Sequence, residues 1–388
     1  MSARSRRSRS PIRLRLTLAG WVFLAATAMV GVVAVNSGLG MLFVLLGAML
    51  GAMHVSAVLG RRMIAAVQVE RELPVRSRQN RVISVGYVLR SIRGGGACLA
   101  VRVEEAALKG LSIPPTACGY LPGSGSRLAR SEAVASRRGR VAFRAIRLSS
   151  TFPFGLVRAA RQMERGASLI IWPARGRLTS RLLGRGEAQS AAAAPSIRSG
   201  GQDEFYGLRE YRPGDSARWI HWRRSAGRKD PVIREMARPR PQTLWVVLDT
   251  LLTDDTAAAA ARRERAIRLA ATLAEEALEA GYRVGAAMAY SSQVLVRAPT
   301  DRRAQRARLL DVLAEIDDNR TGRLEEAVAR LRAGWLRQAH VVVIALSPPS
   351  GAVLSRLRRD CRGLTVVQAE RAGELFRDDP AAAGQEAL

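Results

Sequence analysis

The chain has 388 residues, of which 62 are Lys or Arg and 33 are Asp or Glu, so its formal net charge is +29. Because Lys109 and Lys229 are the only lysines and the arginines are spread along the chain, we do not take this basicity as evidence for nucleic-acid binding. The three cysteines are far apart and lack C-x-x-C spacing, which excludes the residue pattern of a disulfide framework or a zinc site.

An uncharged region begins the chain after its first arginines. Residues 16–60 contain no Asp, Glu, Lys or Arg. One helix of that length would be about twice as long as a hydrocarbon core, which is about 30 Å thick. The turn-forming run Asn36-Ser37-Gly38 leaves two segments, 16–35 and 39–59, that are each long enough to cross. We therefore predict a two-helix transmembrane hairpin over residues 16–60.

Arginines flank this hairpin on both sides, whereas its turn has no charge. By the positive-inside rule, both termini are predicted to be cytoplasmic, with residues 1–15 as a basic tail. The chain is then a multi-pass protein of the inner membrane whose arginines contact anionic membrane lipid. A cleaved signal peptide is the alternative, but no small-x-small cleavage site stands out near Val35. His54 in the second segment either marks a proton or ion path or lies at the interface.

A β-rich domain is expected next, over residues 61–175. Short strand patterns alternate there with Gly- and Pro-rich turns, which predicts an Ig-like sandwich. The predicted strands are 65–73, 82–93, 99–105, 140–148, 157–163 and 168–172. Residues 176–200 have no aromatic residue and no sustained apolar period, so we predict a linker.

From Leu244 onward, buried strands alternate with amphipathic helices. This alternation predicts a mainly parallel sheet that helices cover on both faces. The expected strands are 244–248, 283–290, 293–297, 341–346 and 364–368, and the expected helices are 257–280, 302–316, 324–331 and 353–359. The domain is predicted to span residues 201–375, with 376–388 as a disordered tail.

The segment 201–225, which precedes that sheet, contains two of the six tryptophans and two of the six tyrosines. Asp215, His221 and Ser225 supply the residue types of a nucleophilic triad, although no strand-turn-helix elbow accompanies the serine. Arginines interleaved with aromatic residues could stack on single-stranded nucleic acid, although no known nucleic-acid module accompanies them. We favour a third interpretation, a cluster of arginines, carboxylates and aromatic rings that clamps the segment across the sheet.

The same segment resembles a known family signature. Glu204-Phe-x-x-Leu-Arg-Glu-Tyr-x-Pro-Gly-Asp215, followed by Arg218-x-Ile-x-Trp222 and Ser225, resembles the bacterial family known as domain of unknown function 58 (DUF58). Arg138-Gly-Arg140, Phe152-Pro-Phe-Gly-Leu156 and Trp172-Pro173 resemble upstream features of these proteins. The candidate interaction residues are Glu204, Phe205, Leu208, Arg209, Glu210, Tyr211, Pro213, Gly214, Asp215, Arg218, Ile220, His221, Trp222 and Ser225.

This resemblance implies that the α/β domain is like von Willebrand factor type A, with a Rossmann-type, mainly parallel sheet. Such domains normally bind Mg²⁺ through a D-x-S-x-S loop, a Thr and a later Asp. Here Asp249 matches the leading Asp, and Thr253 and Thr321 are weak candidates for two further ligands. Leu251 and Ser347 replace the first Ser and the last Asp, so one certain carboxylate remains. We therefore expect neither strong Mg²⁺ binding nor any other cofactor.

The resemblance also implies a MoxR-type AAA+ ATPase as partner. Our leading hypothesis is a non-enzymatic, membrane-anchored adaptor or scaffold that presents a cytoplasmic protein-interaction domain, with no catalytic residues and no nucleic-acid partner. Two alternatives stay open: a metal-dependent or Asp/His hydrolase that uses Asp215, His221 and Asp249, and a nucleic-acid-binding membrane protein. No G-x-x-x-x-G-K-[ST] loop occurs, so the chain itself does not hydrolyse ATP by that route.

Overall fold

The computed structural model describes most of the chain in two compact units. The first unit consists of Met1–Gly176, Ala307–Asp318 and Asp378–Leu388, and the second of Arg177–Arg306 and Asn319–Arg377. The described residues are 11–92, 96–108, 110–178, 205–212, 220–226, 230–236, 242–252, 254, 256–290, 293–298, 302–316 and 323–378.

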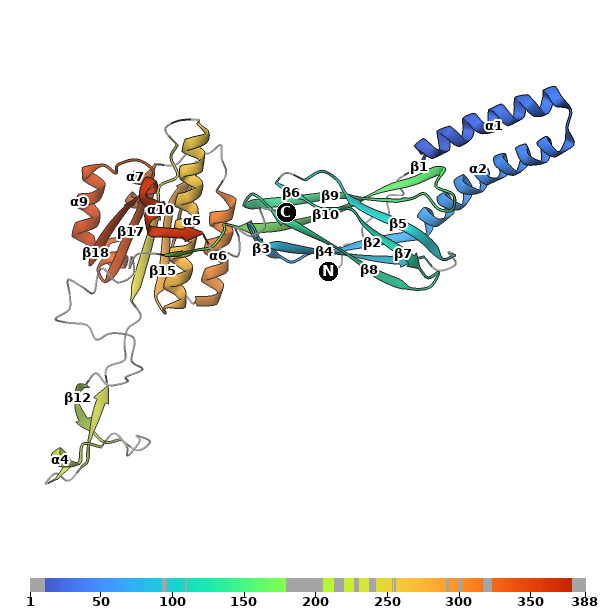
Figure 1. The fold of residues 1–388 in the computed structure, drawn as a ribbon. Coiled ribbons are helices and arrows are strands. Elements are labelled where there is room, and N and C mark those ends of the chain that lie inside the picture. The colour runs from blue at the N-terminus through green and yellow to red at the C-terminus, as the bar shows by residue number, and fades with distance from the viewer. Residues whose placement is uncertain are drawn as a thin grey trace. The chain divides into compact units, whose positions relative to one another are not determined.

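Two long apolar helices, α1 (Leu18–Ser37) and α2 (Gly40–Ala66), form the predicted hairpin in the first unit (Figure 1). Gly38 ends α1 with a φ of 70°, a conformation that favours glycine, and its N–H donates to the carbonyl of Ala34. Both helices are long and apolar enough to cross a membrane. α2 continues past residue 59 because Arg61 and Arg62 are good helix formers, so the end of the uncharged run does not mark the end of the helix.

Residues 12–15 lie in the segment that we predicted as a basic tail, residues 1–15, and Leu16 lies in the predicted hairpin, residues 16–60. They form strand β1 (Ile12–Leu16), which pairs antiparallel with β10 (Val157–Trp172). The sequence Ile-Arg-Leu-Arg-Leu alternates apolar and basic residues, so one face of the strand can turn toward the core. The arginines suggested a tail, but at a spacing of two they occupy only the outer face.

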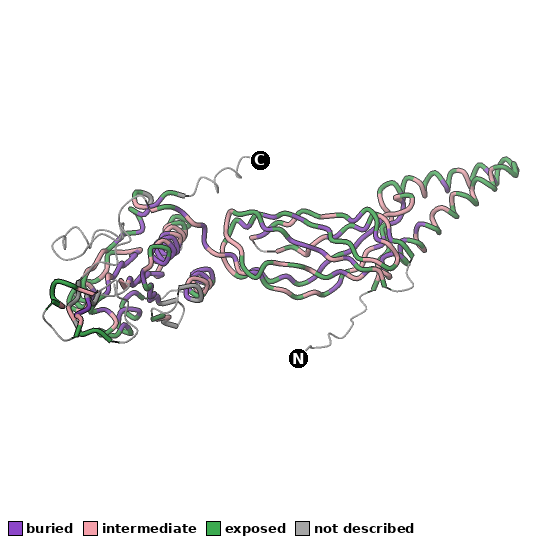
Figure 2. Tube along the Cα trace, turned by 90° about the horizontal axis from the view of Figure 1, so that it is seen from below, coloured by how far each residue is buried: buried purple, intermediate pink, exposed green. Residues whose placement is uncertain are grey.

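Two sheets make up the β-rich domain. One has the order β1-β10-β9-β5-β7, with β3 also paired to β10, and the other has the order β2-β4-β8-β6. Their remaining strands are β2 (Val67–Glu72), β3 (Arg76–Arg78), β4 (Val82–Ser91), β5 (Cys98–Glu105), β6 (Leu111–Ser112), β7 (Thr116–Leu121), β8 (Ser126–Ala135) and β9 (Gly139–Ser150). Buried side chains of both sheets, such as Leu89 and Leu148, belong to one core, and Figure 2 shows these buried positions alternating with exposed ones along the strands.

A buried ion pair links the two sheets. Arg71 of β2 donates from Nε and Nη2 to the two carboxylate oxygens of Glu105 on β5, at 2.7 and 2.8 Å, and both side chains are 3% exposed. The guanidinium lies 4.7 Å from the ring centroid of Phe143. Burial raises the pKa of Tyr87, and the charge of Glu105 and a hydrogen bond to it act in the same direction. Because an unpaired buried charge is strongly unfavourable, removing either partner of this pair would destabilise the domain.

A five-stranded sheet forms the core of the second unit, with the order β16-β15-β14-β17-β18. Its strands are β14 (Thr243–Leu248), β15 (Arg283–Tyr290), β16 (Gln293–Arg297), β17 (Ala339–Ala345) and β18 (Gly363–Gln368). All neighbouring strands run parallel except β15 and β16, which are antiparallel. The prediction of a mainly parallel sheet is therefore confirmed.

Helices pack on both faces of this sheet. On one face α7 (Leu324–Ala329), α8 (Ala333–Leu336) and α9 (Gly351–Asp360) share a core with Trp245 and Val343. The buried residues that alternate with these along β14 and β17 lie on the opposite face, where α5 (Ala257–Glu279) contacts β14, β15 and β17. The remaining helices of this unit are η2 (Ala369–Arg371) and α10 (Ala372–Leu375). Helix α6 (Arg302–Glu315) is assigned to the second unit as far as Arg306 and to the first unit from Ala307.

The predicted linker and the predicted disordered tail each begin with a strand. β11 (Gly176–Leu178) pairs with β19 (Phe376–Asp378). Phe376 is buried, and the guanidinium of Arg268 lies 5.8 Å from its ring centroid, so an apolar contact holds this end of the chain. The rest of both segments, 179–200 and 379–388, lies outside the described residues.

Candidate functional site

The loop Phe152-Pro-Phe-Gly-Leu156 contacts the start of helix α1. Thr17 caps this helix: its N–H donates to the carbonyl of Leu156 at 3.0 Å, and its Oγ1 donates to the carbonyl of Gly155 at 2.6 Å. The same Oγ1 accepts from the N–H of Gly20 at 3.0 Å. One threonine therefore satisfies an orphan amide of the helix and also fixes the loop of the sandwich beneath it.

Helix α2 also approaches this loop closely, at Gly60. A Cβ atom on Gly60 of α2 would lie 3.7 Å from the carbonyl oxygen of Phe152 and 3.3 Å from the Cβ of Ala159. Small residues in apolar helices permit such close backbone approach. The loop thus contacts α1 near its first turn and α2 near Gly60. Gly20 and Gly60 were the sequence signal for this junction, and we did not predict the junction from them.

Arg138-Gly-Arg140 and Trp172 contact residues 307–316, which belong to the same unit as the sandwich. Arg138 donates from Nε to the carbonyl of Leu313 at 3.1 Å and from Nη2 to that of Ile316 at 2.8 Å, at the carboxyl end of α6. Arg140 donates from Nε to Glu315 at 3.0 Å. Cationic donors at a helix carboxyl terminus satisfy carbonyls that have no helical partner.

Asp311 lies at the centre of this contact. It accepts from Nε1 of Trp172 at 2.8 Å and from Nε and Nη2 of Arg76 at 2.9 and 2.8 Å. Burial acts to raise the pKa of Asp311, but the hydrogen bonds from Arg76 and Trp172 and the charges of Arg76 and Arg140 outweigh it and hold the pKa below its usual value. Two of the upstream family-like features therefore serve one polar contact within the first unit.

Asp249, the leading metal candidate, lies at the carboxyl end of β14 and is 3% exposed. Its Oδ1 accepts from the N–H of Leu251 at 3.1 Å and its Oδ2 from that of Leu346 at 3.2 Å. Burial raises the pKa of Asp249, backbone hydrogen bonds from Leu251, Leu346 and Ser347 oppose the rise, and the charge of Glu325 adds to it. Both carboxylate oxygens thus already bond to the loops that follow β14 and β17.

The surroundings of Asp249 contain a basic side chain. Arg262 lines a narrow pocket together with Leu251 and Ser347, and it forms an ion pair with Glu370 at 3.1 Å. Thr253 and Thr321, the other two metal candidates, lie outside the described residues. Among the residues that the structure does describe, no group of three or more His, Cys, Asp or Glu side chains is placed to hold a metal ion.

The signature segment forms a small hairpin of its own. β12 (Phe205–Glu210) pairs antiparallel with β13 (Val232–Met236), with Leu208 opposite Arg234, and this pair is separate from the five-stranded sheet. The one-turn helix α4 (Trp222–Ser225) lies between them in the chain, after an isolated bridge from Ile220 to Ile233. Glu204, Pro213, Gly214, Asp215 and Arg218 lie outside the described residues, as do the side chains of Phe205 and Arg209.

His221 and Ser225 hold α4 against β13. The N–H of His221 donates to the carbonyl of Val232 at 2.7 Å, and its Nδ1 accepts from the N–H of Arg224 at 3.3 Å. The hydroxyl of Ser225 donates to the carbonyl of His221 at 3.0 Å and accepts from the N–H of Val232 at 2.9 Å. Two of the three side chains of the triad alternative, His221 and Ser225, thus bond to nearby backbone atoms, and the third, Asp215, lies outside the described residues.

The same hairpin exposes aromatic and basic side chains. Trp222 is 69% exposed and Tyr211 37% exposed, and Arg223 and Arg224 of α4 are exposed as well. We call Tyr211, Trp222, Arg223 and Arg224 the signature surface. Its aromatic and arginine side chains are of the types that dominate protein–protein binding energy.

Residues 207–359 match the model of a family described as protein of unknown function DUF58. The match runs from β12 through the strands β14 to β17 and ends in α9, so it leaves out β18 of the five-stranded sheet. It does not include the apolar helices or the strands of the sandwich. A search of curated proteins finds no match to the chain.

Proposed function

We propose that this chain, which belongs to the DUF58 family, is a membrane-anchored, non-enzymatic adaptor for a MoxR-type AAA+ ATPase. The observation that carries the proposal is the signature surface, where a tryptophan, a tyrosine and two arginines are exposed on a hairpin held by its own backbone bonds. A large aromatic ring that is exposed to water is available for a protein partner. The resemblance of the signature to the family supplies the class of ATPase.

Anchoring in the cytoplasmic membrane, with both termini inside, is part of this proposal. Leu18 and Met41 are 84% and 86% exposed, and other large apolar side chains along α1 and α2 are exposed as well. Such a surface is favourable in lipid and unfavourable in water. Arginines lie before α1 and near the end of α2, while the turn between the helices has no charge, which agrees with cytoplasmic termini.

The second unit is proposed to be a domain like von Willebrand factor type A that works without a metal. The mainly parallel sheet and the aspartate at the end of β14 support this fold. The carboxylate of Asp249 supports metal independence, because both of its oxygens accept backbone hydrogen bonds and Arg262 already places a cation near the adjoining loops. The carboxylate then holds two loops together instead of binding Mg²⁺.

Co-purification tests the proposed partnership. The tagged full-length chain is recovered from detergent-solubilised membranes, with and without ATP, and the bound proteins are identified by mass spectrometry. We expect an AAA+ ATPase in the bound fraction. Trp222→Ala should reduce the binding free energy by about 2 kcal/mol, or the affinity by roughly thirtyfold, since an exposed tryptophan at an interface centre is a typical hot spot.

Tyr120→Ala is the matched control, because Tyr120 is also an exposed aromatic residue, 53% exposed, on strand β7 of the sandwich. This variant should retain the ATPase. Failure to recover any AAA+ ATPase under either nucleotide condition would overturn the partnership, and equal losses with both variants would overturn the role of the signature surface.

A further inference from the structure

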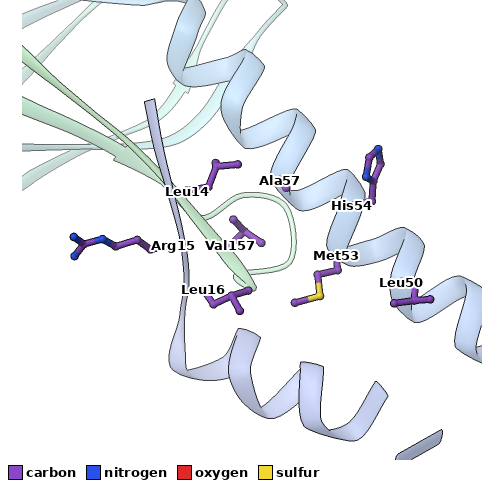
Figure 3. A pocket seen from close by; sticks show the side chains of 8 residues that line it. All are labelled: Leu14, Arg15, Leu16, Leu50, Met53, His54, Ala57 and Val157. Atoms are coloured by element: carbon purple, nitrogen blue, oxygen red, sulfur yellow. The ribbon is translucent and has the colours of Figure 1, made fainter. Parts of the chain in front are cut away.

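A notch of about 410 Å³ lies where α2 passes strand β1 (Figure 3). One wall is a stripe of α2 at helical spacing, and the other is one face of β1 with the start of β10. The apolar residues that line it are Leu14, Leu16, Leu50, Met53, Ala57 and Val157. His54 and Arg15 also border the notch.

Arg15, which borders the notch, also belongs to a cluster of positive charge on the other face of strand β1. Figure 3 shows Arg15 extending to the opposite side of β1 from Leu16. In the antiparallel register, Arg15 lies directly opposite Arg158 of β10, and Arg13 shares the face of Arg15. Opposed residues in a sheet have Cβ atoms about 5 Å apart, so two arginine side chains leave neighbouring positions on this face.

These arginines have no acidic partner in the described part of the chain. None of Arg13, Arg15 and Arg158 forms an ion pair there, although ion pairs occur elsewhere in the same domain, for example between Arg102 and Glu104. Like charges that face each other across strands destabilise a sheet. An anion bound between them would remove this repulsion.

We propose that one anionic phospholipid occupies this place, with its phosphate between Arg15 and Arg158 and an acyl chain in the notch. Because β1 is an edge strand, only the width of one strand separates the apolar notch from the arginine cluster. A phospholipid carries both an apolar chain and a negative charge in one molecule, so it can occupy both places. The residues before β1 include Arg4, Arg6, Arg7 and Arg9 and no Asp or Glu, so they cannot neutralise the cluster. The proposal rests on the membrane anchoring proposed above.

Native mass spectrometry of the full-length chain in detergent tests this site. The protein is titrated with phosphatidylglycerol and, separately, with phosphatidylcholine of the same acyl chains. We expect one tightly retained phosphatidylglycerol, and binding about tenfold or more weaker in the Arg15→Gln/Arg158→Gln variant, since each juxtamembrane arginine contributes about fivefold. Arg130→Gln/Arg144→Gln is the control, because both arginines are exposed strand residues of the same domain.

A second variant tests the notch independently of the charges. Ala57→Phe fills the apolar space from the α2 side and should also weaken phosphatidylglycerol binding, even if the arginine variant proves unstable. Equal retention of both lipids, or competition by soluble glycerol phosphate at the same concentration, would overturn the lipid site. A protein found in place of the lipid would overturn it as well.

The lipid proposal and the ATPase proposal can be refuted independently of each other. The signature surface is untouched by these substitutions, so the Arg15→Gln/Arg158→Gln and Ala57→Phe variants should still capture the ATPase. Loss of lipid with retained ATPase supports the lipid site alone. Unchanged lipid binding in the same variants contradicts the site whatever the ATPase result.

Discussion

A Cβ atom added to Gly20 would lie 2.1 Å from the carbonyl oxygen of Leu156, a distance that real Cβ atoms essentially never show. The first turn of α1 and the loop of the sandwich are therefore in backbone contact. This contact fixes how the apolar hairpin continues into the β-rich domain, and it leaves no room for a side chain.

Gly20→Ala should consequently disrupt the junction. We expect the free energy of unfolding to fall by about 1–3 kcal/mol, because the added methyl group must push α1 or the loop away and strain the cap at Thr17. Gly47→Ala on α2 is the control, since a Cβ there meets nothing within 4 Å. Limited proteolysis of the detergent-solubilised chain reads out the opening of the junction, and equal resistance of both variants would refute the contact.

Asp311→Asn should weaken the first unit in a pH-dependent way. The pKa of Asp311 is held below its usual value, so the folded state favours the carboxylate. Its stabilisation is present above the unfolded pKa of about 3.9 and is lost as the pH falls through the folded pKa. In urea unfolding of the full chain, the variant should have a lower free energy of unfolding than the unaltered chain at pH 7, and this difference should be smaller at pH 3.

Glu132→Gln provides the control for that experiment, because Glu132 is an exposed carboxylate on β8. It should unfold like the unaltered chain at both pH values. Trp172→Phe should cost about 1.5 kcal/mol at pH 7, since it removes a hydrogen bond to a charged group. A deficit of Asp311→Asn that is as large at pH 3 as at pH 7 would contradict the ionic role of Asp311.

His221→Asn separates capping from acid–base chemistry. Asparagine keeps a side-chain acceptor for the N–H of Arg224 but cannot transfer a proton near neutral pH, so an adaptor should retain its function. His221→Ala removes the acceptor and should destabilise the hairpin by about 1 kcal/mol. The assay is complementation with protein levels matched, and a complete loss with His221→Asn would favour the hydrolase alternative.

A titration of the full chain with Mg²⁺ and with Mn²⁺ should give no binding heat. The oxygens of Asp249 accept two backbone hydrogen bonds, and Asp249→Asn should cost about 1–3 kcal/mol by leaving one amide unsatisfied, with or without Mg²⁺. Isothermal calorimetry makes the measurement. A saturable heat that Asp249→Asn abolishes would establish a metal site.

The sheets were predictable where large apolar residues alternate with polar ones, as in β4, β5 and β9. The strand β8 was missed because its inward side chains are Ala129, Ser131, Ala133 and Ala135, which give no hydrophobic signal although they are buried. Two strands were predicted where β10 is continuous, because a register shift between Glu164 and Ala167 interrupts the alternation. Such bulges depend on the partner strand, which a single sequence does not reveal.

The candidate site was predictable as a segment but not as a geometry. Aromatic residues and arginines marked the signature, yet whether Trp222 is buried or exposed depends on α4, which Ser225 holds through bonds to His221 and Val232. The partners of Arg138 and Trp172 lie more than a hundred residues away in the chain. Contacts at that separation leave no periodic trace in the sequence.

Photo-crosslinking from position 222 tests the adaptor function most directly. A photoreactive phenylalanine analogue replaces Trp222 in the full-length chain, and Tyr120 in a control, and intact membranes are irradiated before solubilisation. The account predicts a covalent adduct between position 222 and a subunit of an AAA+ ATPase, and none from position 120. An adduct with the ATPase from both positions, or from neither, would contradict it.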